Sequence, residues 1–324
     1  MRTLLTTAAI AALVLAVPAT AQTPPPATTT ATPPPATTPP PPAGTQVARP
    51  TTPLNPGDAT PPPPPPLAPV LPGAIGEYRP LDPQNALVID TTKGRIIVEM
   101  HPEAAPKHVE RIKQLSKMGF YDGQQFHRVI DWFMAQTGDP LGTGEGQSPY
   151  PDLEAEFTFQ RDGTMPFTPV SAPAGALMGF IGALPVQTQP DSLMALTGTG
   201  KVRAWGLYCP GVAGMARGEP ENSANSQFFL MRQPYPSLEK RYTVWGRVVV
   251  GLEVVRAMNI GEPPTTPDKM LRVRVAADMP ANDQPRVQIM DTRSPAFRAM
   301  VEKVKKANGA DFSVCDIELP TKVG

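Results

Sequence analysis

The segment FHRVIDWFMAQTGDP, residues 126 to 140, places polar groups that could take part in catalysis among large apolar residues. Its ionisable side chains are His127, Arg128, Asp131 and Asp139. A histidine with an aspartate could serve a hydrolase only beside a nucleophile or a bound metal, and this segment supplies neither. Its chemistry must therefore be of a kind that needs no nucleophile.

Residues that commonly bind metals are few in the chain. Two cysteines, Cys209 and Cys315, cannot form a four-ligand zinc site. The three histidines, His101, His108 and His127, lack the usual ligand spacings, and we interpret His127 as a satisfied structural side chain. We therefore expect a protein that uses neither a metal nor an organic cofactor.

The elements that must position the 126–140 segment are mostly short strands. The run 87–100 predicts a hairpin that turns at Lys93-Gly94. The run 106–118 predicts an amphipathic helix, because a proline stands in its first turn and a glycine follows its last apolar residue. Further strands are predicted at 126–130, 133–137, 227–231, 243–250 and 271–276, and a second helix at 251–258. Many short strands with few helices favour a mainly β fold, a closed antiparallel barrel.

The first residues have the pattern of a signal peptide. Residues 1–21 contain one positive charge, a short apolar run and Ala19-Thr20-Ala21 as a small-residue cleavage site. The alternative, an anchoring transmembrane helix, needs about 20 apolar residues, more than this run offers before Pro18. We expect an exported protein, periplasmic in a bacterium, with no membrane anchor after cleavage.

The next segment has a composition that cannot form a core. Residues 22–73 hold 21 of the chain's 45 prolines, and their only charged residues are Arg49 and Asp58. Proline favours an extended chain, so we predict a disordered linker rich in Pro and Thr. It is either a solubilising linker without a partner or a spacer that holds the folded part away from whatever the N-terminus touches.

Charge and cysteine content further limit the class of protein and the compartment in which it works. The chain has 29 basic and 29 acidic residues, so it lacks the basic surface expected of a nucleic-acid-binding protein. An exported chain meets an oxidising compartment, where a pair of cysteines can persist as a disulfide. We predict that Cys209 pairs with Cys315, which we place in a C-terminal strand.

Three long sequence blocks resemble the cyclophilin family of peptidyl-prolyl isomerases. They are FYDGQQFHRVIDWFMAQTGDPLGTGEG (120–146), GMARGEPENSANSQFFL (214–230) and RYTVWGRVVVGLEVV (241–255). The resemblance covers about 85–278 and implies a closed eight-stranded antiparallel barrel capped by two helices. An insert at about 160–211 interrupts it, and a C-terminal extension, 279–324, follows it.

The resemblance implies a role for Arg128, which matches the arginine of the family's FHR motif. Rotation about an X-Pro bond faces a barrier of about 18–20 kcal/mol, because the C–N bond has partial double-bond character. A guanidinium that donates a hydrogen bond to the prolyl nitrogen stabilises the twisted state, in which the lone pair is localised. Arg128 is therefore the candidate catalytic residue, and the alternative is a structural cation paired with Asp139.

The resemblance also implies a substrate-binding set. Four apolar residues would form the proline pocket, although strand residues of this kind are also common in barrel cores: Phe133, Met134, Phe229 and Leu238. Gln136 would orient Arg128 or the substrate carbonyl. Ala216 and Gln227 match positions that contact the substrate backbone. Arg217 and Tyr242 stand where many relatives have asparagine and histidine.

The sequence departs from the family at three places. Trp132 replaces the glycine that usually precedes the Phe-Met pair, and Ser237 stands where well-known relatives carry a tryptophan that packs on cyclosporin. The insert is either a lid over the substrate groove or an elaborated loop with its own minor core. For 285–320 in the extension we predict a strand, a helix that begins at Ser294 and Pro295, and a second strand.

These features predict an exported, monomeric peptidyl-prolyl cis-trans isomerase that acts on proline-containing segments of unfolded or extended proteins. The alternative is a non-catalytic peptide-binding or chaperone module that uses the same barrel.

Overall fold

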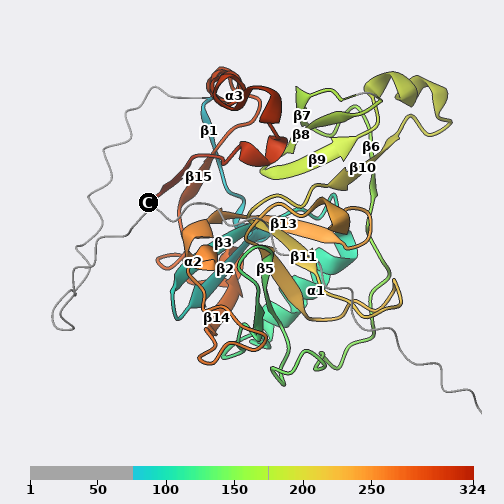
Figure 1. Ribbon diagram of the computed structural model, residues 1–324. Coiled ribbons are helices and arrows are strands. Elements are labelled where there is room, and N and C mark those ends of the chain that lie inside the picture. The colour runs from blue at the N-terminus through green and yellow to red at the C-terminus, as the bar shows by residue number, and fades with distance from the viewer. Residues whose placement is uncertain (1–75, 174) are drawn as a thin grey trace, which may run out of the picture. The chain divides into compact units, whose positions relative to one another are not determined.

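The computed structural model describes residues 76–173 and 175–324. The predicted signal peptide and linker, residues 1–21 and 22–73, lie outside these residues. Eight strands form one curled antiparallel sheet (Figure 1). In sheet order they are β14 (Met270–Val275), β2 (Ala86–Thr91), β3 (Gly94–Met100), β13 (Val244–Val250), β11 (Val212–Met215), β12 (Phe228–Met231), β5 (Met134–Thr137) and β4 (Arg128–Val129).

The eight-stranded sheet confirms the predicted mainly β architecture. Isolated bridges, Gln125 with Lys269 and Val129 with Gly261, link the region of β4 to the region of β14. Full closure into a barrel stays a prediction. The predicted strand at 126–130 is shorter than expected, because only Arg128 and Val129 pair with β5.

Two helices lie against this sheet. α1 (Pro106–Lys117) packs buried Val109, Ile112 and Leu115 into the apolar core inside the curled sheet. Gly119 follows it with φ +70°, a left-handed conformation that glycine adopts without strain. α2 (Leu252–Arg256) has only five residues and buries Val255 in the same core. The predicted capping by two helices is thus seen in part.

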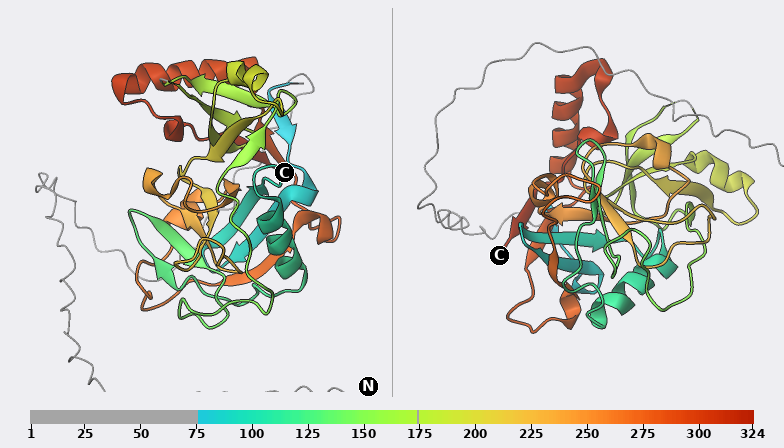
Figure 2. Two further views of the ribbon diagram at one scale, coloured as in Figure 1. Left: turned by 90° about the vertical axis from the view of Figure 1, so that its right-hand side faces the viewer. Right: turned by 60° about the horizontal axis from the view of Figure 1, so that its bottom comes forward.

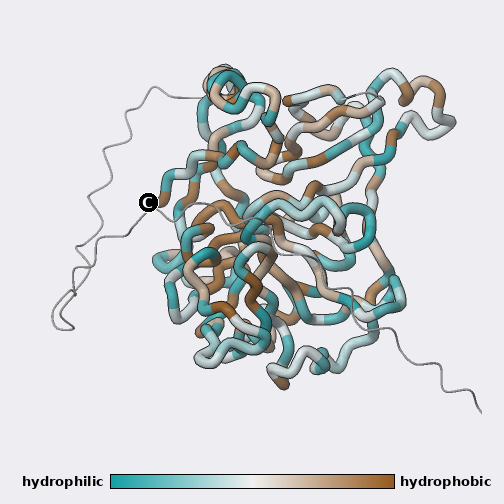
Figure 3. The backbone as a smooth tube through the Cα atoms, viewed as in Figure 1, coloured by the Kyte–Doolittle hydropathy of each residue, from teal (hydrophilic) through white to brown (hydrophobic). Residues whose placement is uncertain are grey.

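Strand alternation divides the apolar residues of the large sheet between an inner and an outer face. Val129, Ala135 and Leu230 point into the curled sheet, and they belong to the core that also receives α1. Met134 and Phe229 point to the outer face, into a second cluster. Figure 3 shows hydrophobic residues along the central strands and hydrophilic residues on many outer loops. The outer face therefore carries the residues of the predicted site.

The insert forms a sheet of its own, which differs from the elaborated loop that was one of its two predicted alternatives, and a role as a lid stays a prediction. Its five strands, in order, are β6 (Phe159–Arg161), β10 (Val202–Gly206), β9 (Leu184–Thr188), β8 (Leu177–Ile181) and β7 (Phe167–Ser171). A 3₁₀ helix, η2 (Asp191–Leu196), lies between β9 and β10. The core of the insert is continuous with the outer-face cluster of the large sheet.

The C-terminal extension contains β15 (Val287–Met290), α3 (Pro295–Asn308) and β16 (Thr321–Val323). Ser294 caps α3 by accepting a hydrogen bond from the Phe297 amide, as expected of Ser before Pro at a helix start. β15 also pairs with β1 (Tyr78–Pro80), so the extension joins the segment that precedes the large sheet. The second predicted strand lies after residue 320, beyond its expected position.

Other 3₁₀ helices complete the described chain: η1 (Pro83–Asn85), η3 (Pro236–Leu238), η4 (Ala276–Asp278), η5 (Gly309–Asp311) and η6 (Val314–Asp316). Within residues 76–173 and 175–324, no helix has the length and apolar character needed to cross a bilayer. Figure 2 shows α3 and the insert strands on the same side of the large sheet.

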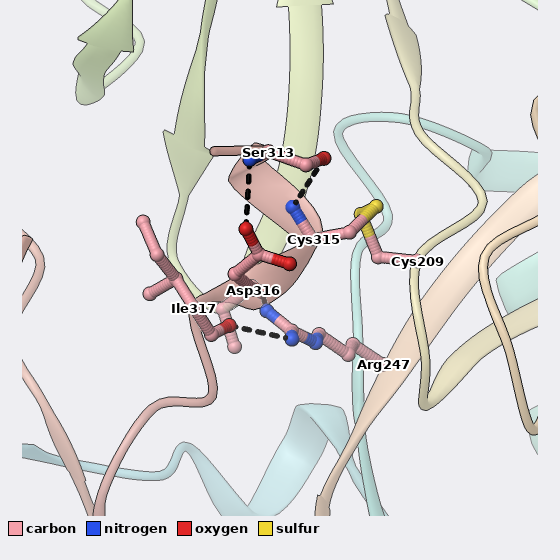
Figure 4. Close-up of a disulfide and its surroundings, with 7 residues drawn as sticks. Cys209, Arg247, Ser313, Cys315, Asp316 and Ile317 are labelled. Carbon is pink, nitrogen blue, oxygen red and sulfur yellow. Dashed lines mark hydrogen bonds between the residues drawn. A yellow bond between two sulfur atoms is a disulfide. The ribbon is translucent and has the colours of Figure 1, made fainter. Parts of the chain in front are cut away.

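The disulfide between Cys209 and Cys315 confirms the predicted pairing (Figure 4). Cys315 lies in η6, so its placement in a strand was wrong. Beside it, the buried Arg247 of β13 donates hydrogen bonds to the carbonyl oxygens of Ala183 in the insert and Ile317 in the extension. Burial lowers the pKa of Arg247 to about 10. These contacts attach the insert and the extension to the large sheet.

Candidate active site

Three adjacent strands place the main candidate residues in one row across the sheet. Arg128 of β4 lies opposite Gln136 of β5, and Gln136 lies opposite Phe229 of β12. Residues directly opposite each other in a ladder point to the same face. The row therefore brings the guanidinium, the amide and the aromatic ring together on the outer face.

Arg128 is held at two of its nitrogen atoms. Its Nε donates to Glu262 Oε2 at 2.6 Å, and its Nη1 donates to Gln136 Oε1 at 3.4 Å. Among the described residues, none accepts a hydrogen bond from Nη2. The side chain is 39% exposed, so part of it is open to solvent. The alternative pairing with Asp139 was wrong, because the carboxylate that pairs with Arg128 is Glu262.

Asp139 has a different function in the structure. Its carboxylate accepts hydrogen bonds from the backbone amides of Leu141, Thr143 and Gly144. Although burial opposes ionisation, these donors hold the pKa of Asp139 below its usual value. Asp139 thus fixes the loop after β5, which borders the site.

A chain of amide hydrogen bonds orients Gln136. Gln227 Nε2 donates to the carbonyl oxygens of Gly144 and Gly146, so Gln227 Oε1 faces Gln136. Gln136 Nε2 donates to this oxygen at 2.9 Å, which turns Gln136 Oε1 toward Arg128. The two glutamines therefore act as a fixed relay that presents an acceptor to the guanidinium.

The four predicted pocket residues belong to the outer-face apolar cluster. Met134, Phe229 and Leu238 are buried, and Phe133 is half-buried. Gly214, opposite Phe229, makes room for its ring, since a Cβ there would lie 2.5 Å from Phe229 Cζ. Because the cluster includes residues of the insert and the extension, these side chains are core and candidate pocket at once.

Ala216, Arg217, Gln136 and Gln227 line a cavity of about 280 Å³ beside this cluster. Arg217 Cζ lies 4.7 Å from the centre of the Tyr242 ring, and the Tyr242 ring meets that of Phe229 edge to face. The two residues that depart from the family's asparagine and histidine thus stack on each other. The structure brings all ten predicted site residues into one region.

The insert and the neighbouring turns contribute residues that sequence reasoning missed. Tyr208 stacks on Phe229 with ring centres 5.9 Å apart, and Glu262 holds Arg128. No periodic pattern marks either residue.

His127 is buried, which lowers its pKa, and neither ring nitrogen has a hydrogen-bond partner among the described residues. His127 is thus buried, as the structural interpretation expected, but it lacks the hydrogen-bond partners expected of a satisfied side chain.

No group of three or more His, Cys, Asp or Glu side chains suited to a metal ion occurs in the described part of the chain. The chemistry available at the site is that of a fixed guanidinium beside apolar rings and two amides. Such a set can hold an apolar ring and donate a hydrogen bond to a group beside it.

The comparisons with known proteins agree with this geometry. The sequence model of the cyclophilin-type peptidyl-prolyl cis-trans isomerases matches residues 86–275. A probable peptidyl-prolyl cis-trans isomerase of Brucella suis is 34% identical over 222 residues, covering 64% of this chain and 90% of the relative. A peptidyl-prolyl cis-trans isomerase of Schizosaccharomyces pombe is 30% identical over 189 residues, covering 57% and 94%.

A solved structure is also similar. The crystal structure of cyclophilin AquaCyp293 from Hirschia baltica has a TM-score of 0.71 and 34% sequence identity, and the match covers 76% of this chain and 93% of that one. The chain belongs to the cyclophilin-type peptidyl-prolyl cis-trans isomerase family. It is an isomerase of the peptide bond that precedes proline.

Proposed function

We propose that this isomerase acts on X-Pro bonds of extended or unfolded polypeptides outside the cytoplasm, with Arg128 as the catalytic residue. One observation carries the assignment of Arg128. Two of its nitrogens are held by Glu262 and Gln136, while Nη2 has no acceptor among the described residues. A planar guanidinium fixed in this way presents a donor with little freedom left to lose.

The mechanism follows from the electronic structure of the bond. In the planar ground state the prolyl nitrogen shares its lone pair with the carbonyl, and it is a poor acceptor. As the bond twists, the lone pair localises on nitrogen and becomes a good acceptor. A donor at Arg128 Nη2 then stabilises the twisted state more than either planar state, which lowers the barrier.

The surrounding residues would hold the substrate during this rotation. Phe133, Met134, Phe229 and Leu238 offer an apolar surface for the proline ring. Ala216, Arg217 and Gln227 line the polar cavity on one flank, where the substrate backbone would lie, with Tyr242 behind Arg217. Apolar contacts that persist throughout the rotation bind the substrate, and the guanidinium contact that grows during rotation provides the rate enhancement.

Two features support action outside the cytoplasm. Disulfides persist in oxidising compartments and are rare in the cytosol, and both cysteines of this chain form one. Residues 1–21 have the composition of a signal peptide. We propose that the protein is exported, works as a monomer, and meets unfolded proline-containing chains there.

An exchange assay tests this function. The rate of cis–trans exchange of a short Ala-Pro peptide is measured by NMR or by coupled proteolysis, with and without protein. We expect acceleration that Arg128→Ala removes. Peptide binding without acceleration would favour the alternative, a non-catalytic chaperone module.

A further inference from the structure

An aromatic surface adjoins the site outside the polar cavity. We call Trp132, Phe133 and Tyr235 the aromatic shelf. Trp132 is 64% exposed, and its ring stacks on Phe133 with centres 6.2 Å apart. The ring of Tyr235 lies 4.4 Å from that of Phe133 and 6.3 Å from that of Trp132. Three rings thus form one surface, and its outermost member faces solvent.

The turn that carries Trp132 is held in place by a buried cation. Arg232 donates from Nη2 to Asp131 Oδ1 at 2.6 Å, and its backbone amide donates to the Phe133 carbonyl oxygen. Other donors of the same guanidinium bind carbonyl oxygens at the end of α2, including that of Arg256 at 2.8 Å. Trp132 is therefore presented on a braced turn. An exposed indole held in this way loses little freedom when it binds a ligand.

The shelf is continuous with the catalytic centre. Arg128 Cζ lies 5.9 Å from the centre of the Phe133 ring, so Phe133 belongs both to the shelf and to the candidate proline pocket. The residues that line the polar cavity beside Gln136 and Gln227 do not include any shelf residue. A polypeptide with its proline at Arg128 would therefore lie within reach of two distinct surfaces, the polar cavity and the shelf.

We propose that the aromatic shelf is a specificity subsite for an aromatic or large apolar side chain that flanks the substrate proline. The proposal rests on the function proposed above, since it takes Arg128 as the position of the rotating bond. Ring stacking adds to simple burial of area, and the gain for an aromatic flanking residue should be about two- to tenfold in kcat/KM. Trp132 is the specificity-determining residue, because it supplies the exposed face.

The test uses two peptide series around Ala-Pro, one with Phe or Ala before the dipeptide and one with Phe or Ala after it. Exchange rates and calorimetric affinities are measured for the wild type, Trp132→Ala, Trp132→Phe and the control Leu196→Ala. Leu196 is 80% exposed and lies in η2 of the insert. Leu196→Ala therefore also removes an exposed apolar side chain, but one that is not part of the shelf. Tm for each variant establishes that it is folded.

We expect the wild type and Leu196→Ala to prefer Phe in one series, Trp132→Ala to lose that preference while keeping the Ala rates, and Trp132→Phe to retain most of it. Equal losses for Phe and Ala peptides, or a preference that survives in Trp132→Ala, would overturn the proposal. The exchange rates of the Ala peptides test the proposed isomerase function separately from the specificity of the shelf. If no peptide were accelerated, the function would fail, and the affinities would still decide whether Trp132 selects aromatic residues.

Discussion

Removing the carboxylate of Glu262 should slow the enzyme without unfolding it. Glu262 Oε2 accepts from Arg128 Nε at 2.6 Å, while the other anchor, Gln136, is at the longer distance of 3.4 Å. Glu262→Ala therefore leaves the guanidinium with its weaker anchor. The side chains of the pair are 39% and 53% exposed, so solvent limits the interaction to about 1 kcal/mol at most.

The size of the expected effect follows from this limit. If all of the interaction serves to orient Arg128, about 1 kcal/mol corresponds to roughly a fivefold lower kcat, with KM little changed. Glu262→Gln keeps an acceptor oxygen and should lose less. Salt screens the ion pair, so the wild-type rate should fall at high ionic strength more than the Glu262→Gln rate.

The assay is NMR exchange on an Ala-Pro peptide at several salt concentrations. A matched control is Glu318→Ala, which breaks a similarly exposed pair with Arg256 whose side chains are 42% and 59% exposed. Both variants should lose less than about 1 kcal/mol of unfolding free energy, but only Glu262→Ala should lose activity. A faster Glu262→Ala enzyme would show that the carboxylate competes with substrate. A loss on the order of 100-fold would contradict a positioning role of this size.

Three further predictions concern the disulfide, the position of the Phe229 ring and a buried histidine. The double variant Cys209→Ser, Cys315→Ser removes the disulfide, which joins residues 106 positions apart, and should lower the unfolding free energy by up to about 4–5 kcal/mol. Urea titrations measure this loss, and an unchanged unfolding midpoint would refute it. Gly214→Ala should displace the Phe229 ring and raise KM for an Ala-Pro peptide, while unaltered kinetics would show that the ring position is immaterial. His101 lies between two carboxylates that raise its pKa from 6.5 to about 9 despite burial, so its contribution to stability is full below pH 6.5 and is lost as pH rises through 9. His101→Gln should flatten the decline in unfolding free energy over that range, and an equal decline in both proteins would contradict the assignment.

The elements predicted from sequence were those with a strong local signal. α1 has apolar residues on one face between Pro106 and Gly119, and the hairpin of β2 and β3 turns at Lys93-Gly94. The insert sheet was missed because glycine in a short apolar run resembles a loop. Gly179 of β8 shows the reason, since a Cβ there would lie 2.0 Å from the Thr168 carbonyl oxygen of β7. The glycine permits a close strand contact that only the folded structure reveals.

The candidate site was predictable where its residues share a motif. Arg128 and Gln136 stand eight residues apart, on two strands that pair directly. Glu262 is 134 residues from Arg128, and it reaches the guanidinium only because the chain returns beside Val129 through the bridge to Gly261. Such a partner depends on tertiary topology, which local patterns do not contain.

The exchange rate of an Ala-Pro peptide in the presence of Arg128→Ala tests most directly whether Arg128 is the catalytic residue. The half-exposed side chain lies on the outer face, so the variant should keep the wild-type circular dichroism spectrum. We predict a loss in rate on the order of 100-fold or more with little change in peptide affinity, and only partial recovery in Arg128→Lys. Phe229→Ala, in contrast, should weaken peptide binding as well. A folded Arg128→Ala protein with near-normal exchange rates would contradict the assignment of Arg128 as the catalytic residue.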